Sequence, residues 1–240
     1  APSTHPEATP VIPGIHAVQG RNSIIVAPHP RAKLTNKKIC DLMRAALKRV
    51  GAPEDLVIGI ETPSLETTNE LMRQCDLVLA TGGGAMVHAA YSSGSPALGV
   101  GVGNAVITVD DTADLDAAAE KIRLSKTLDL AASCSSDNSV VLLDGIYEPM
   151  LEKLKAQGGY LCNEEEKAAL RNTLWDEELH LNTAIVAQPP EKIAQMAGLS
   201  IPEETKFFIV PEEGWGPEHP FSGEKLSVIM ALYRARDRAP

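Results

Sequence analysis

The segment DLVLATGGGAMV, residues 76–87, joins an apolar, strand-like run to three glycines and then to a helix-like segment. Glycines let a phosphate approach the backbone, and the N-terminus of the helix that follows supplies free N–H donors. The segment is neither a G-x-G-x-x-G motif nor a P-loop, because no Lys-Ser or Lys-Thr pair follows the glycines. From the residues alone, a nucleotide-binding turn and a plain tight turn explain Thr81, Gly82, Gly83 and Gly84 equally well.

Strand-like and helix-like segments alternate on both sides of this turn. Apolar runs predict strands at 23–27, 56–60, 76–80, 96–100 and 105–110, and apolar residues at helical spacing predict helices at 36–50, 65–73 and 114–126. Strands alternating with helices at this spacing are typical of a parallel, doubly wound α/β sheet of the Rossmann type. The proline-rich residues 1–14 are expected to be extended.

The alternation continues after residue 127. Here the pattern predicts strands at 140–143, 184–187, 206–210 and 226–232, and helices at 147–156 and 164–174, the last with Asn163 as its N-cap. A second α/β domain is therefore expected to begin near Thr127, so that the domains would be residues 1–126 and 127–240.

The composition excludes several classes of protein. The 240 residues carry a formal net charge of -10 and no basic cluster, which argues against nonspecific nucleic-acid binding. No apolar run approaches the ~20 residues that a membrane-spanning helix needs, and the first residues lack the regions of a signal peptide. The four cysteines form no C-x-x-C pair, so neither a zinc ribbon nor another metal site is expected. A cytoplasmic protein with no membrane association fits these features best.

One cysteine stands out by its surroundings. Cys134 lies in AASCSSDNS, residues 131–139, among small polar side chains just before an apolar run. A cysteine that serves packing usually lies inside an apolar segment, as Cys40 does, whereas a thiolate in a polar loop can be exposed and reactive. Taken alone, the stretch fits both a reactive thiol and a loop cysteine without a role.

Several ordered blocks of the chain resemble one known family. These blocks are NSIIVAPHPRAK, DLVLATGGGAMVHAAYSSGSPALGVGVGN, SKTLDLAASCSSDNS, GGYL and EKLSVIMALYRARD. They are similar to the CoA-acylating branch of the aldehyde dehydrogenase superfamily, and in particular to the aldehyde dehydrogenase half of bifunctional aldehyde-alcohol dehydrogenases; SCSSDNS is closer to sulfoacetaldehyde-type members. The resemblance implies a Rossmann-type nucleotide-binding domain followed by a catalytic domain, and sequence missing from both ends of the chain.

The resemblance also implies roles for individual residues. It places Cys134 as the nucleophile and Glu224, in GEKLS, as the carboxylate that holds the nicotinamide ribose. His5 takes the place where most members have an asparagine that helps to form the oxyanion hole. Further positions beside the cofactor are Pro28, His29, Pro30, Thr81, Gly82, Gly83 and Gly84.

The family chemistry implied here is the conversion of an aldehyde, CoA and NAD(P)⁺ to an acyl-CoA and NAD(P)H. Val100 takes the position of the glutamate that activates water in hydrolytic members, and an apolar side chain cannot accept a proton. The aldehyde, and the choice between NAD and NADP, stay open. A hydrolytic dehydrogenase that makes a free acid, or an inactive nucleotide-binding fragment or assembly protein, are the alternatives. Relatives associate, so a homo-oligomer, a dimer or larger, is expected.

Overall fold

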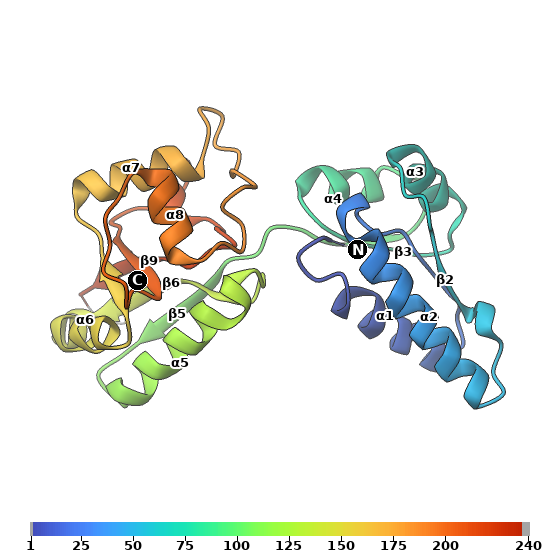
Figure 1. Ribbon diagram of the computed structural model, residues 1–240, viewed down its shortest axis with the longest axis horizontal. Coiled ribbons are helices and arrows are strands. Elements are labelled where there is room, and N and C mark those ends of the chain that lie inside the picture. Colours follow the sequence, from blue (N-terminus) through green and yellow to red (C-terminus); the bar gives the residue numbers. More distant parts are fainter. Residues whose placement is uncertain (1, 237–240) are drawn as a thin grey trace. The chain divides into compact units, whose positions relative to one another are not determined.

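The computed structural model describes residues 2–236, and the chain divides into two compact units between Val102 and Gly103. We call them unit 1, up to Val102, and unit 2, from Gly103 onward (Figure 1). The strand and the helix that follow Val102 therefore belong to unit 2, and the compact units do not follow the expected division at residues 126 and 127. The assignment of nucleotide binding to residues 1–126 and of catalysis to residues 127–240 stays a prediction.

Unit 1 contains two pairs of parallel strands with helices packed against them. The strands β1 and β2 form one pair, and β3 and β4 form the other. Its elements are α1 (Ala8–Gln19), β1 (Ile24–Val26), α2 (Lys33–Arg49), β2 (Val57–Gly59), α3 (Leu65–Gln74), β3 (Val78–Thr81), α4 (Gly84–Tyr91) and β4 (Ala97–Val100). The predicted strands and helices of this region are confirmed, with ends that shift by a few residues.

The start of the chain corrects one expectation. Residues 8–19 form α1 rather than an extended segment, although Pro13 lies inside the helix. Pro10 falls in the first turn, where a backbone N–H has no partner within the helix, so its missing donor costs little. The buried face of α1, with Pro10 and Gly14, packs against β1 and α2. This packing outweighs the low helical propensity of proline.

The hydrophobic core of unit 1 consists of two small clusters. Val26, Cys40 and Val57 form one cluster, which confirms Cys40 as a core residue. Met72, Val78, Ala80 and Ala90 form the other. The alternate side chains of β3 and β4 point outward, and three of them are apolar and exposed: Leu79, Leu98 and Val100.

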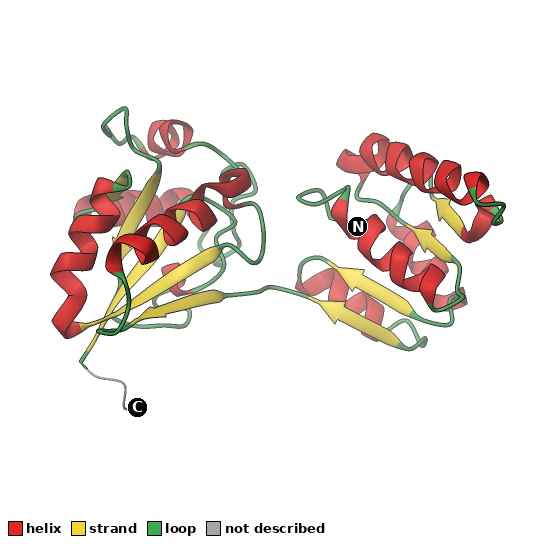
Figure 2. Ribbon diagram, turned by 90° about the horizontal axis from the view of Figure 1, so that it is seen from below, coloured by secondary structure: helices red, strands yellow, loops and turns green. Residues whose placement is uncertain are grey.

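Unit 2 is built on a five-stranded, fully parallel sheet with the strand order β5-β6-β9-β8-β7 (Figure 2). Helices α5 and α6 lie along one face of this sheet, and α7 and α8 lie along the other (Figure 1). The elements are β5 (Ala105–Val109), α5 (Leu115–Thr127), β6 (Asp137–Leu143), α6 (Tyr147–Ala156), β7 (Gly159–Leu161), α7 (Glu164–Leu174), α8 (Pro190–Ala197), β8 (Phe207–Pro211) and β9 (Ile229–Ala235).

Three parts of unit 2 differ from the expectations. The apolar run at 184–187 is not a strand: Ile185 is buried, but Ala187 has a φ of 54° and the run belongs to the connection between α7 and α8. The helix α8 and the three-residue strand β7 were not predicted. Pro190 begins α8 and the left-handed Gly198 ends it, which are favourable positions for these residues.

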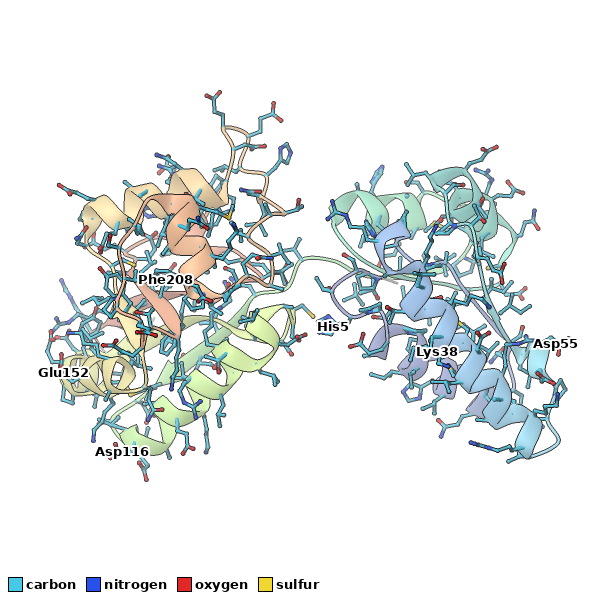
Figure 3. The ribbon with its side chains drawn as sticks, in the orientation of Figure 1. His5, Lys38, Asp55, Asp116, Glu152 and Phe208 are labelled. Atoms are coloured by element: carbon cyan, nitrogen blue, oxygen red, sulfur yellow. The ribbon has the colours of Figure 1, made fainter. Side chains whose placement is uncertain are left out.

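One continuous hydrophobic core fills unit 2. It includes Phe207, Phe208 and Leu142, and Trp175 packs edge-on against Phe221 with 4.9 Å between the ring centroids. Figure 3 shows Phe208 in the interior of this unit, whereas Asp116 and Glu152 point away from it. Within residues 2–236, no helix is long and apolar enough to cross a membrane.

Candidate active site around Cys134

Three segments of unit 2 meet at one edge of its sheet. Each leads into one of three neighbouring parallel strands: Gly103 and Asn104 lead into β5, Cys134 leads into β6, and Glu224 leads into β9. Because the strands are parallel and adjacent, the segments that precede them lie at the same edge. The sheet therefore brings Cys134 and Glu224, which are 90 positions apart in the chain, to one place.

Cys134 is presented by an unusual stretch of backbone. Asp129, Leu130 and Ala131, three to five residues before it, have φ values of 50°, 51° and 57°, in the left-handed region that residues with a side chain rarely adopt. Ala131 and Ala132 are buried, and Cys134 is exposed. The surrounding structure thus holds a turn that the chain would not favour by itself, and this turn leaves the thiol open to solvent.

Glu224 and the backbone of Cys134 both lie beside Gly103. The Gly103 N–H donates a hydrogen bond to Glu224 Oε1 at 3.3 Å. A Cβ atom on Gly103 would lie 3.4 Å from the Cys134 carbonyl oxygen and 3.6 Å from Glu224 Oε1. Burial raises the pKa of Glu224, although the Gly103 hydrogen bond and the Lys225 charge oppose that shift. The Glu224 carboxylate and the backbone of Cys134 thus lie beside the same glycine.

A network of side-chain donors holds the neighbouring backbone, and two of its members, Asn138 and Lys225, are buried. Asn138 Nδ2 donates to Asn104 Oδ1 at 2.7 Å and to the Gly223 carbonyl at 2.6 Å, and Asn104 Nδ2 donates to the Ser222 carbonyl at 2.8 Å. Lys225 Nζ donates to the carbonyls of Phe221, at 2.5 Å, and Gly223, at 3.0 Å. Sequence reasoning did not select Asn104, Asn138 or Lys225. The only signal was their position: Asn138 lies two residues before the apolar run 140–143, and Lys225 lies directly before the predicted strand 226–232.

Two lysines with unusual environments lie in this part of unit 2. Burial lowers the pKa of Lys126, near the end of α5, to about 7, against the opposing charge of Asp137. Burial also lowers the pKa of Lys225 well below its ordinary value, and the positive charge of Lys126 lowers it further. Both side chains are almost completely buried, so their charged forms are costly.

The glycine turn predicted for the cofactor lies in unit 1. Thr81 ends β3, Gly82 and Gly83 form the turn, and Gly84 begins α4. A Cβ atom on Gly83 or Gly84 would meet no atom within 4 Å, so the backbone at the start of α4 is open to an approaching group. The N-terminus of α4 and this open backbone fit a phosphate of a nucleotide or of CoA.

The other predicted positions of unit 1 have ordinary environments. Pro28 is buried, and His29 and Pro30 are exposed. The ring nitrogen His29 Nδ1 accepts the Arg31 N–H at 3.2 Å and so caps a short 3₁₀ turn, Pro30–Ala32. His5, labelled in Figure 3, lies half-buried in the turn before α1. Since His5 belongs to unit 1 and Cys134 to unit 2, their cooperation in an oxyanion hole stays a prediction.

The structure places no cluster of metal ligands in the part of the chain that it describes. No group of three or more His, Cys, Asp or Glu side chains there is arranged to hold a metal ion.

Comparison with known proteins identifies relatives of this arrangement. A sequence model of the "Aldehyde dehydrogenase family" matches residues 4–162. The chain is 45% identical over 240 residues to a sulfoacetaldehyde dehydrogenase of an Acholeplasma species, covering 98% of this chain and 49% of that protein. It is 43% identical over 238 residues to the bifunctional aldehyde-alcohol dehydrogenase of Escherichia coli, covering 98% of this chain and 27% of that protein.

Solved structures have the same fold. An acetylating aldehyde dehydrogenase from Geobacillus thermoglucosidasius superposes with a TM-score of 0.93 at 40% identity, covering 98% of this chain and 52% of the other. A propionaldehyde dehydrogenase from Rhodopseudomonas palustris, solved with bound CoA and an acylated cysteine, superposes with a TM-score of 0.87 at 28% identity, covering 98% of this chain and 54% of the other. The chain thus spans about half the length of most of these relatives, and about a quarter of the bifunctional one.

Proposed function

The chain belongs to the aldehyde dehydrogenase family, and on that premise we propose that it carries out the CoA-acylating reaction of that family. The reaction converts an aldehyde, CoA and NAD(P)⁺ to an acyl-CoA and NAD(P)H, and it is reversible. The observation that carries the proposal is the site itself: an exposed thiol, Cys134, whose backbone lies beside the same glycine that binds the Glu224 carboxylate.

Cys134 is the nucleophile of the proposed mechanism. Its thiolate adds to the aldehyde carbon and forms a thiohemiacetal. The Cys134 N–H and the His5 side chain are the proposed donors to the resulting oxyanion, and one such donor contributes roughly 3 kcal/mol in well-studied enzymes with an oxyanion hole. When bound, the nicotinamide supplies the acceptor for the hydride. Loss of that hydride leaves a thioester on Cys134.

The residue at position 100 favours transfer of the acyl group to CoA over hydrolysis. Val100 ends β4 and offers no group that could take a proton from water. A thiol such as that of CoA is then the acceptor that completes the turnover. Support comes from the relatives described as acylating and from the R. palustris enzyme, which holds CoA and an acylated cysteine.

Further cofactor contacts are proposed from the likeness to the family. The turn Thr81–Gly84 would receive a phosphate group, and Pro28, His29 and Pro30 would line the adenosine end. Glu224 would hold the nicotinamide ribose. One relative, an engineered glycolyl-CoA reductase, was solved with NADP⁺, which supports a nicotinamide cofactor in this family. We also propose a cytoplasmic homo-oligomer that acts on a small aldehyde without a nucleic-acid or membrane partner.

The experiment is NAD(P)H formation over a panel of small aldehydes, sulfoacetaldehyde and acetaldehyde included, with and without CoA. Signal that requires CoA and is lost in Cys134→Ala supports the proposal and identifies the aldehyde. Cys75→Ala, which changes a half-buried cysteine of unit 1, is the matched control and should keep the signal. Full turnover without CoA would replace the proposal with the hydrolytic reaction. Nucleotide binding without turnover would favour the inactive fragment.

A further inference from the structure

The peptide that joins Gly223 to Glu224 is held by two buried donors. Its carbonyl oxygen, that of Gly223, accepts Asn138 Nδ2 at 2.6 Å and Lys225 Nζ at 3.0 Å. A carbonyl oxygen has two lone pairs, so this pair of donors occupies both. With both lone pairs engaged, the peptide plane directly before Glu224 cannot rotate without breaking a buried hydrogen bond.

The same donors tie this peptide to the rest of the site. Asn138 Nδ2 also bonds Asn104 Oδ1, and Lys225 Nζ also bonds the Phe221 carbonyl. Asn104 directly follows Gly103, whose N–H binds Glu224 Oε1. The backbone on both sides of the Glu224 carboxylate is therefore fixed by the side chains of Asn138, Asn104 and Lys225.

Packing alone does not account for Lys225. Its side chain has no exposed surface, and burial lowers the pKa of its amine well below the ordinary value. An apolar side chain of similar length would fill the same space without the cost of burying an amine. The amine donates to two backbone carbonyls of the segment that carries Glu224. Its contribution is therefore to the shape of that segment.

We infer that Lys225 and Asn138 are positioning residues, which fix the direction of the Glu224 carboxylate beside the Cys134 backbone. This inference rests on the proposed function, in which Glu224 holds the nicotinamide ribose. Without these two donors the Gly223 carbonyl turns freely, Glu224 leaves the Gly103 N–H, and the nucleotide loses a fixed contact.

The test follows the hydrogen bond between Gly103 and Glu224 by NMR. An amide proton that is bonded to a carboxylate changes its chemical shift when the carboxylate is protonated. In the unaltered protein, the Gly103 amide resonance should therefore shift as the pH falls through the pKa of Glu224. We expect Lys225→Met and Asn138→Leu to reduce this shift by at least about half, because each removes one donor to the Gly223 carbonyl.

Lys126→Met is the matched control. Lys126 is as deeply buried as Lys225, but its amine is not bonded to Phe221 or Gly223 within the described residues. Lys126→Met should keep the full Gly103 shift. The dispersion of the same spectra shows whether each variant is folded, and Asn138→Leu decides the matter if Lys225→Met does not fold. An unchanged Gly103 shift in a folded Lys225→Met or Asn138→Leu protein overturns the inference.

A second readout separates this inference from the proposed function. If the protein catalyses reduction of NAD(P)⁺, the KM for NAD(P)⁺ in Lys225→Met should rise about tenfold, while kcat changes much less. A tenfold rise corresponds to the loss of one hydrogen bond to a charged group, here the bond between the Glu224 carboxylate and the nucleotide. A general loss of folding would lower kcat as well. If the protein shows no NAD(P)⁺ turnover but the Gly103 shift still depends on Lys225, the proposed function fails and the positioning of Glu224 stands.

Discussion

Lys126 shows at the scale of a single residue how burial changes the chemistry of a side chain. In an unfolded chain its amine titrates near 10.5, whereas burial in the folded protein lowers its pKa to about 7. Below the lower pKa both states carry the proton, and the folded state bears the full cost of a buried charge. Between the two pKa values the unfolded state binds more protons, so raising the pH favours the folded state.

We therefore expect the free energy of unfolding of unit 2 to rise as the pH increases from about 7 toward 10.5. Lys126→Met removes this contribution. At a pH below about 7, the variant should be more stable than the unaltered protein by a few kcal/mol, and this difference should shrink as the pH rises toward 10.5. Urea unfolding at the two ends of the window measures this. A constant difference at both ends would contradict the assigned pKa shift.

A second prediction at the scale of a single residue concerns the packing around Gly159, at the start of β7. An added Cβ would lie 2.7 Å from Ile209 Cδ1 and 2.9 Å from the Leu154 carbonyl oxygen. Because one of these atoms belongs to the backbone, the clash cannot be relieved by a side-chain rotation alone. We expect Gly159→Ala to lower the free energy of unfolding of unit 2 by about 1–3 kcal/mol in urea titrations.

Gly145→Ala is the control for that substitution. A Cβ on Gly145 would meet no atom within 4 Å, and its φ is not in the left-handed region. This variant should unfold at nearly the same urea concentration as the unaltered protein. Equal losses in both variants would contradict a steric origin of the effect at Gly159.

Single residues also show what the sequence could reveal about the site. Cys134 and Glu224 were selected because their motifs resemble those of a family, and the structure brings Glu224 and the Cys134 backbone to the same glycine. Lys225 and Asn138 were missed because a lysine or an asparagine is expected at the surface. Their burial follows from the strands on either side of them, which no local pattern displays.

At the scale of elements, α7 and α1 are opposite cases. The ends of α7, Glu164–Leu174, agree with the prediction, because Asn163 and Glu166 form a capping box that marks the first turn. No comparable signal marks α1, whose helix depends on packing against β1 and α2. The run at 184–187 carries no such signal either: Ile185 is buried but Ala184 is exposed, and the run does not join the sheet.

The capping box gives a prediction for α7. Asn163 Oδ1 accepts the Glu166 N–H at 2.9 Å, and Glu166 Oε2 accepts the Asn163 N–H at 2.9 Å. Asn163→Ala removes one of these bonds and should lower the free energy of unfolding of unit 2 by about 1 kcal/mol. Glu165→Gln, which changes a neighbouring charge but no capping bond, should cost a few tenths of that. Chemical denaturation of both variants would reject the assignment if their losses were equal.

At the scale of the whole molecule, the two units have unequal cores. Unit 1 relies on two clusters of three and four buried residues, whereas the core of unit 2 runs through the whole sheet, from β5 to β7. Less buried apolar area means a smaller free energy of unfolding per residue. Local sequence patterns predict two α/β domains with a boundary near Thr127, whereas the compact units divide at Val102, inside the glycine-containing stretch GVGVGN at residues 99–104. The division into functional domains stays a prediction.

The strand order of unit 2 could not be predicted from the sequence either. Local patterns locate β5, β6 and β9 approximately, but they cannot show that these three strands are neighbours. That adjacency arises because β9 inserts between β6 and β8. It is this order that gathers Gly103, Cys134 and Glu224 at the amino ends of the strands, whereas sites in open α/β sheets usually lie at the carboxyl ends.

The unequal cores predict that the units unfold separately. Both tryptophans of the chain, Trp175 and Trp215, belong to unit 2, so tryptophan fluorescence reports on that unit alone. Circular dichroism at far-ultraviolet wavelengths reports on the helices of both. In a urea titration we expect the circular dichroism signal to begin to fall before the fluorescence of Trp175 changes. Coincident transitions would mean that the two units unfold as one.

The four cysteines differ sharply in their surroundings, and this difference has a practical use. Cys134 is exposed, Cys75 is half-buried, and Cys40 and Cys162 are buried. Burial also raises the pKa of Cys40, Cys75 and Cys162, so that few of these thiols are thiolates near neutral pH. A maleimide or iodoacetamide reagent should therefore alkylate Cys134 first in the native protein. A spin label or fluorophore could thus be attached at the edge of the sheet without removing any other cysteine.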